Sequence, residues 1–275
     1  MNTRRSPFDQ LVRSKPFVAG FAVISVWIVC AGIGRAVAPD DPLNQTSDVL
    51  ARPSMHHLFG TDQLGRDVLS RVLAGAGYVF IVAFPASLLA VVAGSAIGLC
   101  AGYFRGRVDQ IISRLTDAVL SVPLIVLAMV ILTALGHSRL MLVIVIAILF
   151  TPSVSRTMRA AVLTQRDLEY VAAARLRGEG AGYILFREVV PNVTGPIVVE
   201  ATTKFGYAIF TLAGLSFLGF GGQPSSPDWA LQIGDNYALL ASGTYWWTVL
   251  FPGLAIATLL IAVNLVAESI SRALE

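Results

Sequence analysis

Six long apolar stretches limit what this chain can fold into. A helix that crosses a membrane needs about 20 mostly apolar residues, and the sequence reaches this length six times. Only 13% of the residues are charged, whereas a soluble domain carries about 25%. We therefore predict an all-α polytopic membrane protein with six transmembrane helices and little soluble mass. The predicted spans are 17–38, 78–103, 111–135, 140–160, 193–220 and 247–271.

The first stretch has one feature of a cleaved signal peptide, because Ala36-Val37-Ala38 resembles a cleavage site. Its apolar part, 17–33, is longer than the usual core of about 7–15 residues, and five further spans follow. We therefore expect this stretch to remain as the first span. Cys30 and Cys100 both lie within apolar stretches, which favours two small buried side chains over a disulfide or a metal pair.

Lysine and arginine are distributed unevenly among the predicted loops. Cytoplasmic loops of membrane proteins carry an excess of these residues. If the N-terminus is cytoplasmic, fourteen of the 20 lie inside, five lie outside, and Lys204 falls within a span. The bias predicts that both termini and the loop before the fifth span are cytoplasmic. The net charge of +3 is too small and too scattered to indicate a nucleic-acid partner.

The loop before the fifth span carries the signals of a short helix. Asp167 could cap its start, Glu169 lies in its first turn, and Arg175 and Arg177 lie in its last turn. Gly178 then supplies a left-handed stop. At 1.5 Å per residue such a helix measures only about 16 Å, which is too short to cross a membrane.

Two faces of this helix differ in character. Leu168, Val171, Ala172 and Leu176 form an apolar stripe, and Asp167, Tyr170, Ala174 and Arg177 lie opposite. We expect a second helical piece at 180–188, ended by Pro191. Small side chains at 172–174 keep the helix slim enough to enter a groove on another protein, although a solvated loop helix would satisfy the same signals.

The same loop resembles the cytoplasmic loop of permease subunits in bacterial ABC importers. That family has Glu-Ala-Ala, three residues, Gly, nine residues and Ile-x-Leu-Pro, and this chain has Ala172-Ala173-Ala174, Gly178 and Val189-Val190-Pro191. Ala172 replaces the glutamate of the family pattern. The resemblance implies that 161–191 is a coupling loop whose helix docks on an ATPase subunit. The implied coupling residues are Asp167, Glu169, Tyr170, Ala172, Ala173, Ala174, Arg175 and Gly178.

Other segments are similar to the C-type permease subunit of dipeptide, oligopeptide and nickel importers. They are residues 57–71 (HLFGTDQLGRDVLSR), 214–219 (GLSFLG), 227–229 (PDW) and 251–256 (FPGLAI). Ala230 follows Trp229, where the family usually has glycine. The implied extracytoplasmic motif consists of Gly60, Thr61, Asp62, Gly65, Arg66 and Asp67.

This resemblance implies a type I ABC importer permease fold in the cytoplasmic membrane of a bacterium. The expected organisation is a cytoplasmic segment 1–16, a first helix 17–38, an extracytoplasmic segment 39–77 and a five-helix domain 78–275. The implied partners are a homologous B-type permease, two ATPase subunits or domains, an extracytoplasmic binding protein and membrane lipid. The implied activity is import of dipeptides or short oligopeptides, with ATP and magnesium bound by the ATPases and no cofactor in this chain.

The sequence itself offers no energy source. A phosphate-binding loop needs Gly-Lys-Ser/Thr, and neither Lys15 nor Lys204 follows a glycine. Ion-coupled carriers place ionisable groups near the middle of the membrane. Here Asp117, Glu200, Lys204 and Glu268 approach the spans, each expected within a few turns of the cytoplasmic face. A stand-alone ion channel or ion-coupled carrier is the alternative function.

Two smaller features complete the candidate sites. Gly94, Gly98 and Gly102 form a helix-packing stripe, either within the chain or against a sister permease. Lys204, Pro227 and Trp229 are candidates for the pathway or its gate, although the Lys204 side chain could instead extend toward the cytoplasmic surface.

Chemistry carried out by this chain itself is not expected. His56-His57 lacks a third ligand at a suitable spacing, so we expect no metal site. Asp62 and Arg66, four residues apart, are expected to form a local ion pair on a short helix. The sequence shows no catalytic set of Ser, His and Asp or of Cys and His, and we expect no enzyme.

Overall fold

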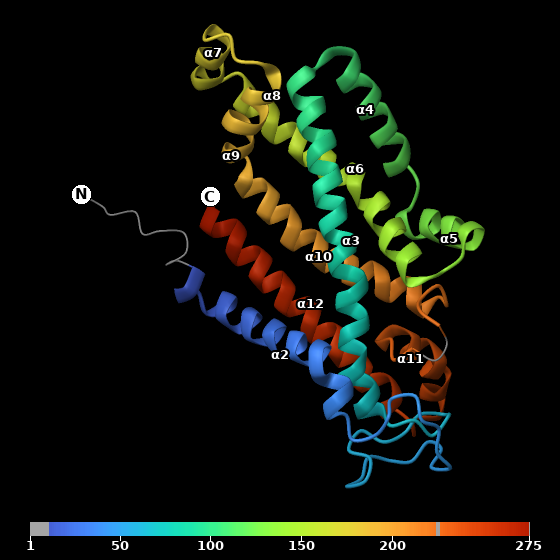
Figure 1. Cartoon of the computed structure of the whole chain (residues 1–275). Helices are drawn as coiled ribbons and strands as arrows, with labels where there is room; N and C mark the ends of the chain where they lie inside the picture. Colours follow the sequence, from blue (N-terminus) through green and yellow to red (C-terminus); the bar gives the residue numbers. More distant parts are fainter. Residues whose placement is uncertain (1–10, 224–225, 275) are drawn as a thin grey trace.

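Figure 1 shows the computed structural model, which describes residues 11–223 and 226–274. Within these residues the only β-structure is an isolated bridge between Thr61 and Asp67, which confirms the all-α prediction. Residues 1–10 of the predicted segment 1–16 lie outside the described residues. The long helices are α2 (Lys15–Val37), α3 (Val68–Phe104), α4 (Gly106–Leu120), α5 (Leu124–Leu135), α6 (Arg139–Arg166), α10 (Thr194–Phe217) and α12 (Trp247–Leu274).

The short helices lie at the two ends of the molecule. Helix α7 (Glu169–Leu176), helix α8 (Ala181–Tyr183), a π-helical turn (Ile184–Val189) and helix α9 (Val190–Asn192) form one end. Helix α11 (Trp229–Asn236), a 3₁₀ turn (Tyr237–Ser242) and the segment 38–67 form the other. We call these the α7 end and the α11 end.

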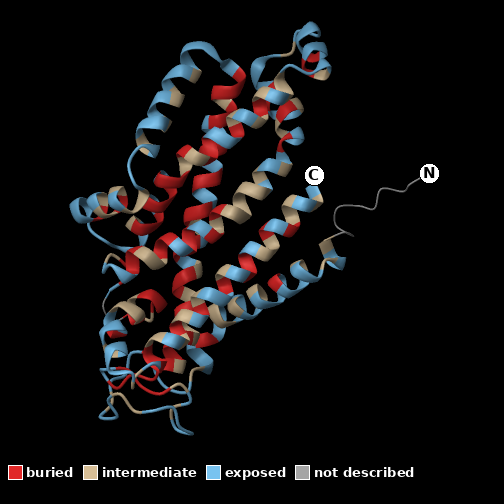
Figure 2. Ribbon diagram, turned by 180° about the vertical axis from the view of Figure 1, so that it is seen from behind, coloured by how far each residue is buried: buried red, intermediate tan, exposed pale blue. Residues whose placement is uncertain are grey.

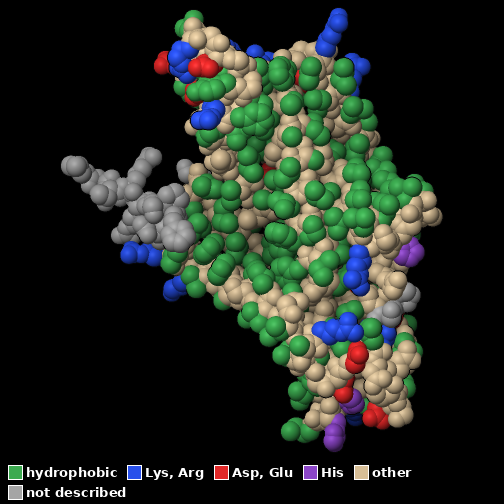
Figure 3. Space-filling view, in the orientation of Figure 1, with side chains coloured by type: hydrophobic (Ala, Val, Ile, Leu, Met, Phe, Trp, Pro, Cys, Tyr) green, Lys and Arg blue, Asp and Glu red, His purple; other side chains and the backbone are tan. Residues whose placement is uncertain are grey.

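Four of the described helices, α2, α3, α6 and α12, are long and apolar enough to cross a membrane, and α4 with α5 makes a fifth if the bent pair is one span. Helix α10 occupies most of the predicted fifth span, 193–220. The six-span count fits this arrangement and stays a prediction. Figure 3 shows hydrophobic side chains covering the middle of the molecule, with charged side chains toward its ends.

Helix α3 begins at Val68, well before the predicted start at 78. The reason is local: the Asp67 carboxylate accepts a hydrogen bond from the Ser70 amide at 2.7 Å and caps the helix. The first turn of α3 contains polar residues that are buried in the α11 end. Apolar content alone therefore places the start of this helix too late in the sequence.

The third predicted span, 111–135, is interrupted. Helices α4 and α5 meet at an angle of 88°, and Pro123 stands at the break, where it cannot continue the hydrogen bonding of α4. Helix α4 is amphipathic, and its Asp117 pairs with Arg156 of α6 at 2.6 Å. By contrast, Pro85, Pro152 and Pro252 lie inside continuous helices.

Helix α3 runs the length of the molecule beside α6, α2 and α12 lie on its other side, and α10 crosses it (Figure 1). Viewed from behind, the buried residues concentrate on α3 and α6 (Figure 2). Two apolar clusters result. One joins α3, α5, α6, α10 and α12 in the middle, and the other joins α3 and α6 to α7 and the π-helical turn.

The glycine stripe on α3 packs within the chain. A Cβ added at Gly94 would lie 2.6 Å from Val154 Cβ, one at Gly98 2.5 Å from the Ser155 carbonyl oxygen, and one at Gly102 2.8 Å from Val162 Cβ. All three neighbours belong to α6. Of the two alternatives, the described residues therefore favour contact inside the chain, where small residues let two membrane helices approach closely.

Gly98→Leu is expected to destabilise the subunit by about 1–3 kcal/mol, because the new side chain overpacks the α3–α6 contact. Thermal unfolding of the purified subunit in detergent measures this. Gly32→Leu on α2 is the matched control, since no heavy atom lies within 4 Å of a Cβ placed there. Equal unfolding temperatures for the two variants would contradict the close packing.

Candidate functional site

Helix α7 ends as the sequence predicts. Gly178 has φ +79°, its amide donates to the Arg175 carbonyl at 3.0 Å, and the Glu179 amide donates to the Ala174 carbonyl at 3.2 Å. This pair of hydrogen bonds is a Schellman cap, which needs a left-handed residue at that position. No heavy atom lies within 4 Å of a Cβ built on Gly178, so the requirement for glycine comes from the backbone alone.

Burial on α7 does not follow the apolar stripe of the sequence. Val171 and Ala174 are the fully buried positions, whereas Leu168 is 45% and Leu176 90% exposed. Val171 and Ala174 belong to the apolar cluster that includes the π-helical turn, α3 and α6, and Leu168 and Leu176 lie outside this cluster. Ala172 and Ala173 share the exposed side with Leu176. This exposed face of α7 (Ala172, Ala173 and Leu176) is small and apolar.

Asp167 does not cap α7, because Leu168 takes the N-cap position. The Asp167 carboxylate instead accepts a hydrogen bond from Arg105, at the start of α4, at 2.7 Å. Arg166 donates to the Tyr103 carbonyl of α3, and the Arg175 guanidinium lies 5.8 Å from the Tyr103 ring centroid. Arg166 and Asp167 therefore tie the end of α6 to α3 and α4, and Arg175 ties α7 itself to α3.

The second helical piece, predicted at 180–188, is longer and irregular. It comprises α8, the π-helical turn and α9, and Pro191 lies in the first turn of α9 instead of ending the piece. Proline is compatible with that position because the first amides of a helix have no intrahelical partner. Arg177 donates to Glu188 at 3.2 Å and joins this piece to the end of α7.

At the α11 end, residues 61–67 form a tight turn rather than the predicted short helix. The predicted Asp62–Arg66 ion pair is present, with Arg66 Nε 2.7 Å from Asp62 Oδ2. The other Asp62 oxygen accepts from the Leu64 and Arg66 amides. Gly60 and Gly65 both have positive φ, near +70°, which explains glycine at these turn positions.

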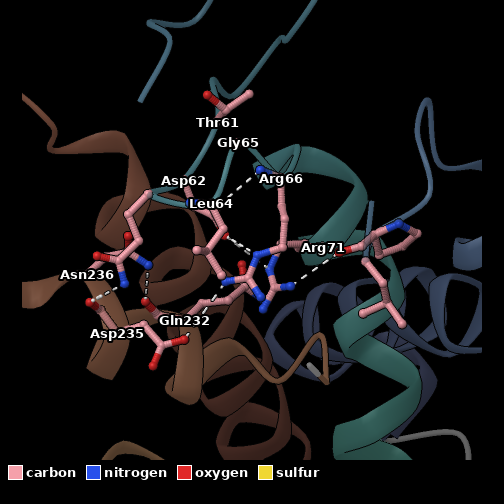
Figure 4. Close-up of polar contacts among 12 residues, drawn as sticks. Thr61, Asp62, Leu64, Gly65, Arg66, Arg71, Gln232, Asp235 and Asn236 are labelled. Atoms are coloured by element: carbon pink, nitrogen blue, oxygen red, sulfur yellow. Dashed lines mark hydrogen bonds and ion pairs between the residues drawn. The ribbon is translucent and has the colours of Figure 1, made fainter. Parts of the chain in front are cut away.

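Arg71 lies at the centre of the polar contacts in Figure 4. It has no exposed surface, donates to the Pro42 carbonyl at 3.2 Å and to the Ser226 carbonyl at 3.1 Å, and lies 3.8 Å from Asp62. One side chain on α3 therefore joins the segment 38–67 to the loop before α11.

Helix α11 contacts the same turn. The Gln63 side chain donates to the Asp235 carbonyl at 3.1 Å, and Arg66 lies 3.9 Å from the Asp235 carboxylate. Burial raises the pKa of the Asp235 carboxyl, and the nearby Arg66 opposes that shift.

Two buried tryptophans extend this polar network. Trp229 donates to the Val72 carbonyl at 2.8 Å, and Trp247 donates to the Thr61 carbonyl at 3.1 Å. Trp229 has no exposed surface and anchors α11 against α3, and its role in the pathway or gate stays a prediction. Pro227 is half-buried beside it and stays a candidate.

Asp228 starts α11. Its carboxylate accepts from the Ala230 amide at 2.9 Å and from the Leu231 amide at 3.3 Å, which caps the helix. Burial raises the pKa of the Asp228 carboxyl, and these amide donors oppose that shift.

Three carboxylates surround His57. Its Nδ1 lies 3.0 Å from Asp67 and 3.7 Å from Asp40, and its Nε2 lies 3.8 Å from Asp48. Asp67 is already engaged as the cap of α3. The arrangement is a polar contact that fastens the segment 38–67, and the expectation that this chain binds no metal stays a prediction.

Lys204 lies inside the helix bundle, and its side chain reaches one turn toward the α7 end. The residue is 9% exposed, its ammonium lies 3.5 Å from Glu200, and the rings of Tyr207 and Phe150 are 5.3 and 5.9 Å away. These contacts place the ammonium among buried neighbours, and the choice between a pathway role and extension toward the cytoplasmic surface stays a prediction.

Comparison with known proteins agrees with this architecture. Residues 94–275 match the family described as binding-protein-dependent transport system inner membrane component. The chain belongs to this family. It is therefore a multi-pass membrane permease and not itself an enzyme.

The permease is also similar to curated proteins over nearly its full length. A dipeptide transport system permease protein of Alkalihalophilus pseudofirmus is 36% identical over 98% of this chain and 89% of the relative. A di/tripeptide transport system permease protein of Pseudomonas aeruginosa is 34% identical over 98% of this chain and 90% of the relative. The dipeptide transport system permease protein of Escherichia coli K12 is 37% identical over 96% and 89%.

The main residue that sequence reasoning missed in this permease is Arg71. In the sequence it is one of the five outside cations and the last residue of the segment 57–71, and the structure places it just inside the N-terminus of an apolar helix. An ionisable residue in such a position is a signal in itself, because it needs partners buried with it. The partners are backbone carbonyls from distant segments, which no local pattern reveals.

Proposed function

We propose that this permease is one half of the membrane pathway of an ATP-driven importer of dipeptides or short oligopeptides. The support is the similarity, at 34–37% identity over nearly the whole chain, to proteins named as dipeptide and di/tripeptide transport system permeases. A homologous B-type permease completes the pathway, and an extracytoplasmic binding protein delivers the peptide.

The exposed face of α7 docks on an ATPase subunit, and ATP and magnesium bind to the ATPases rather than to this chain. Three observations support this role. The face is small and apolar, Leu176 in it is 90% exposed, and Arg175 of α7 together with Asp167 just before it connects this loop to the junction of α3 and α4. A displacement of α7 would therefore displace the ends of those helices.

The α7 end faces the cytoplasm, and so do both termini. The support is the excess of lysine and arginine in the loops assigned to this side. The charged residues of α4 and α7 at this end belong to that excess.

Single-cysteine labelling tests this orientation, after Cys30 and Cys100 are replaced by alanine. A cysteine at Gly180 is expected to react with an impermeant thiol reagent only from the cytoplasmic side, and one at Ser54 only from outside. Both positions are exposed in the structure. Labelling of both from one side would contradict the orientation.

Reconstitution tests the function itself. The permease, its sister permease, the ATPases and the binding protein are placed in liposomes, and accumulation of radiolabelled Ala-Ala is followed with and without ATP. Uptake that requires ATP and all components is the expected result. Uptake or ion flux by this chain alone would instead favour the channel or carrier alternative.

A further inference from the structure

Lys204 and Glu200 place two opposite charges deep inside a membrane helix. At 1.5 Å per residue, Lys204 lies about 15 Å along α10 from Thr194. Their side chains are only 11% and 13% exposed. Ionisable residues at such depth are costly in a membrane, and they are retained mainly where they contact a substrate, an ion or each other in a functional way.

The pair is loosely made. The ammonium nitrogen of Lys204 is 3.5 Å from Glu200 Oε2, whereas a charge-assisted hydrogen bond measures about 2.7–2.9 Å. Among the described residues, Glu200 Oε2 is buried and has no hydrogen-bond partner. The rings of Tyr207 and Phe150 lie 5.3 and 5.9 Å from the ammonium. We call these four residues the Lys204 site.

The Lys204 site borders an open face of α10. Tyr207 is 54% and Phe210 61% exposed, and both lie on the side away from Phe205, which packs against Phe80 and Phe84 of α3. Figure 2 views α10 from behind, with exposed residues along it. A molecule that moves along this face would pass the ammonium, because Tyr207 belongs both to the face and to the site.

We propose that Lys204 binds the carboxylate of the peptide during its passage, and that Glu200 holds the ammonium between passages. This inference rests on the proposed function. The carboxylate of a peptide is the same chemical group as that of Glu200, so the two can exchange on the ammonium. The aromatic rings keep the cation partly stabilised during the exchange.

If Lys204 and Glu200 had only a structural role, apolar residues could replace them. Well-packed apolar residues usually stabilise a buried position at least as well as an ion pair does. Removing one partner leaves a buried uncompensated charge, and removing both relieves that penalty. The two roles therefore give opposite expectations for a double variant in which neither charge remains.

The experiment uses the reconstituted complex and radiolabelled Ala-Ala. Lys204→Met is expected to lower uptake at subsaturating peptide roughly tenfold or more, as loss of a charge-assisted contact predicts. Lys204→Met/Glu200→Gln is expected to stay as low, while Glu200→Gln alone retains uptake. Arg272→Met is the matched control, because Arg272 and Glu268 form another i,i+4 pair on α12 that is 73% and 59% exposed.

Recovery of uptake in the double variant would overturn the inference and leave a structural pair. Loss of uptake in Glu200→Gln, with intact assembly by size-exclusion chromatography, would also overturn it. Absence of ATP-dependent Ala-Ala uptake by the unaltered complex would overturn the proposed function, and this inference with it. Normal transport by the unaltered complex together with recovery in the double variant would overturn the inference alone.

Discussion

Arg71→Met is expected to lower the free energy of unfolding of the permease by about 3–5 kcal/mol, the cost of removing one partner from a buried charged network. The guanidinium is fully buried and donates to the Pro42 and Ser226 carbonyls. Without it those carbonyls lose their donors, and Asp62 loses one of its two neighbouring cations. Methionine fills a similar space but offers no hydrogen bond.

Unfolding of the purified permease by titration with a denaturing detergent measures this loss. Arg35→Met is the matched control at the same end of the molecule, because Arg35 is 71% exposed and contacts Asp41 only at 3.9 Å. Exposed substitutions usually change stability by less than about 0.5 kcal/mol. Equal stabilities for the two variants would show that Arg71 does not hold the α11 end together.

Patterns within one segment predict this fold well. Apolar length located α2, α6, α10 and α12, and the left-handed stop at Gly178 follows from the charges and small residues that precede it. The i,i+4 pair of Asp62 and Arg66 is equally local, and it formed without the helix that suggested it. These features depend on residues that are close together in the sequence, so they can be predicted from one sequence.

Features that depend on distant segments were missed. The break at Pro123 separates α5 from an amphipathic α4, and the polar side of α4 pairs with α6. A hydropathy window averages the polar and apolar sides of α4, so it does not reveal the break. The buried face of α7 is set by the π-helical turn rather than by the stripe of α7 alone. Lys204 finds its aromatic neighbour Phe150 on α6.

In the candidate site, too, local features were predicted and contacts between distant segments were not. Family resemblance pointed to α7 and to the turn at 61–67, and the structure brings most of the turn's residues into one polar network with Arg71. It also shows Ala174 buried inside the chain. Of the three alanines in the coupling motif, only Ala172 and Ala173 are exposed. The sequence cannot distinguish them from Ala174, because all three side chains are identical.

That distinction sharpens the prediction for the exposed face of α7. Ala173→Arg is expected to leave the permease inserted and as stable as the unaltered protein, because the position is exposed. The same variant is expected to lose the ATPase subunits on purification and to lose ATP-dependent peptide uptake, because a groove that accepts methyl groups excludes a guanidinium. Ala174→Arg should differ, since it forces a charge into the cluster around Val171 and destabilises the chain itself.

Uptake by the reconstituted complex, co-purification of the ATPases and thermal unfolding of the permease are measured on the same preparations. Ala241→Arg, exposed at the α11 end, is the matched control and should leave all three unchanged. Gly178→Val tests the cap separately. A residue with a Cβ costs about 1–2 kcal/mol in the left-handed conformation, and no neighbouring atom obstructs a side chain at Gly178. Any loss of uptake in Gly178→Val therefore reports a change in the backbone direction after α7. A solvated loop helix would tolerate both Ala173→Arg and Gly178→Val, and normal uptake in both would show that α7 does not attach the ATPase.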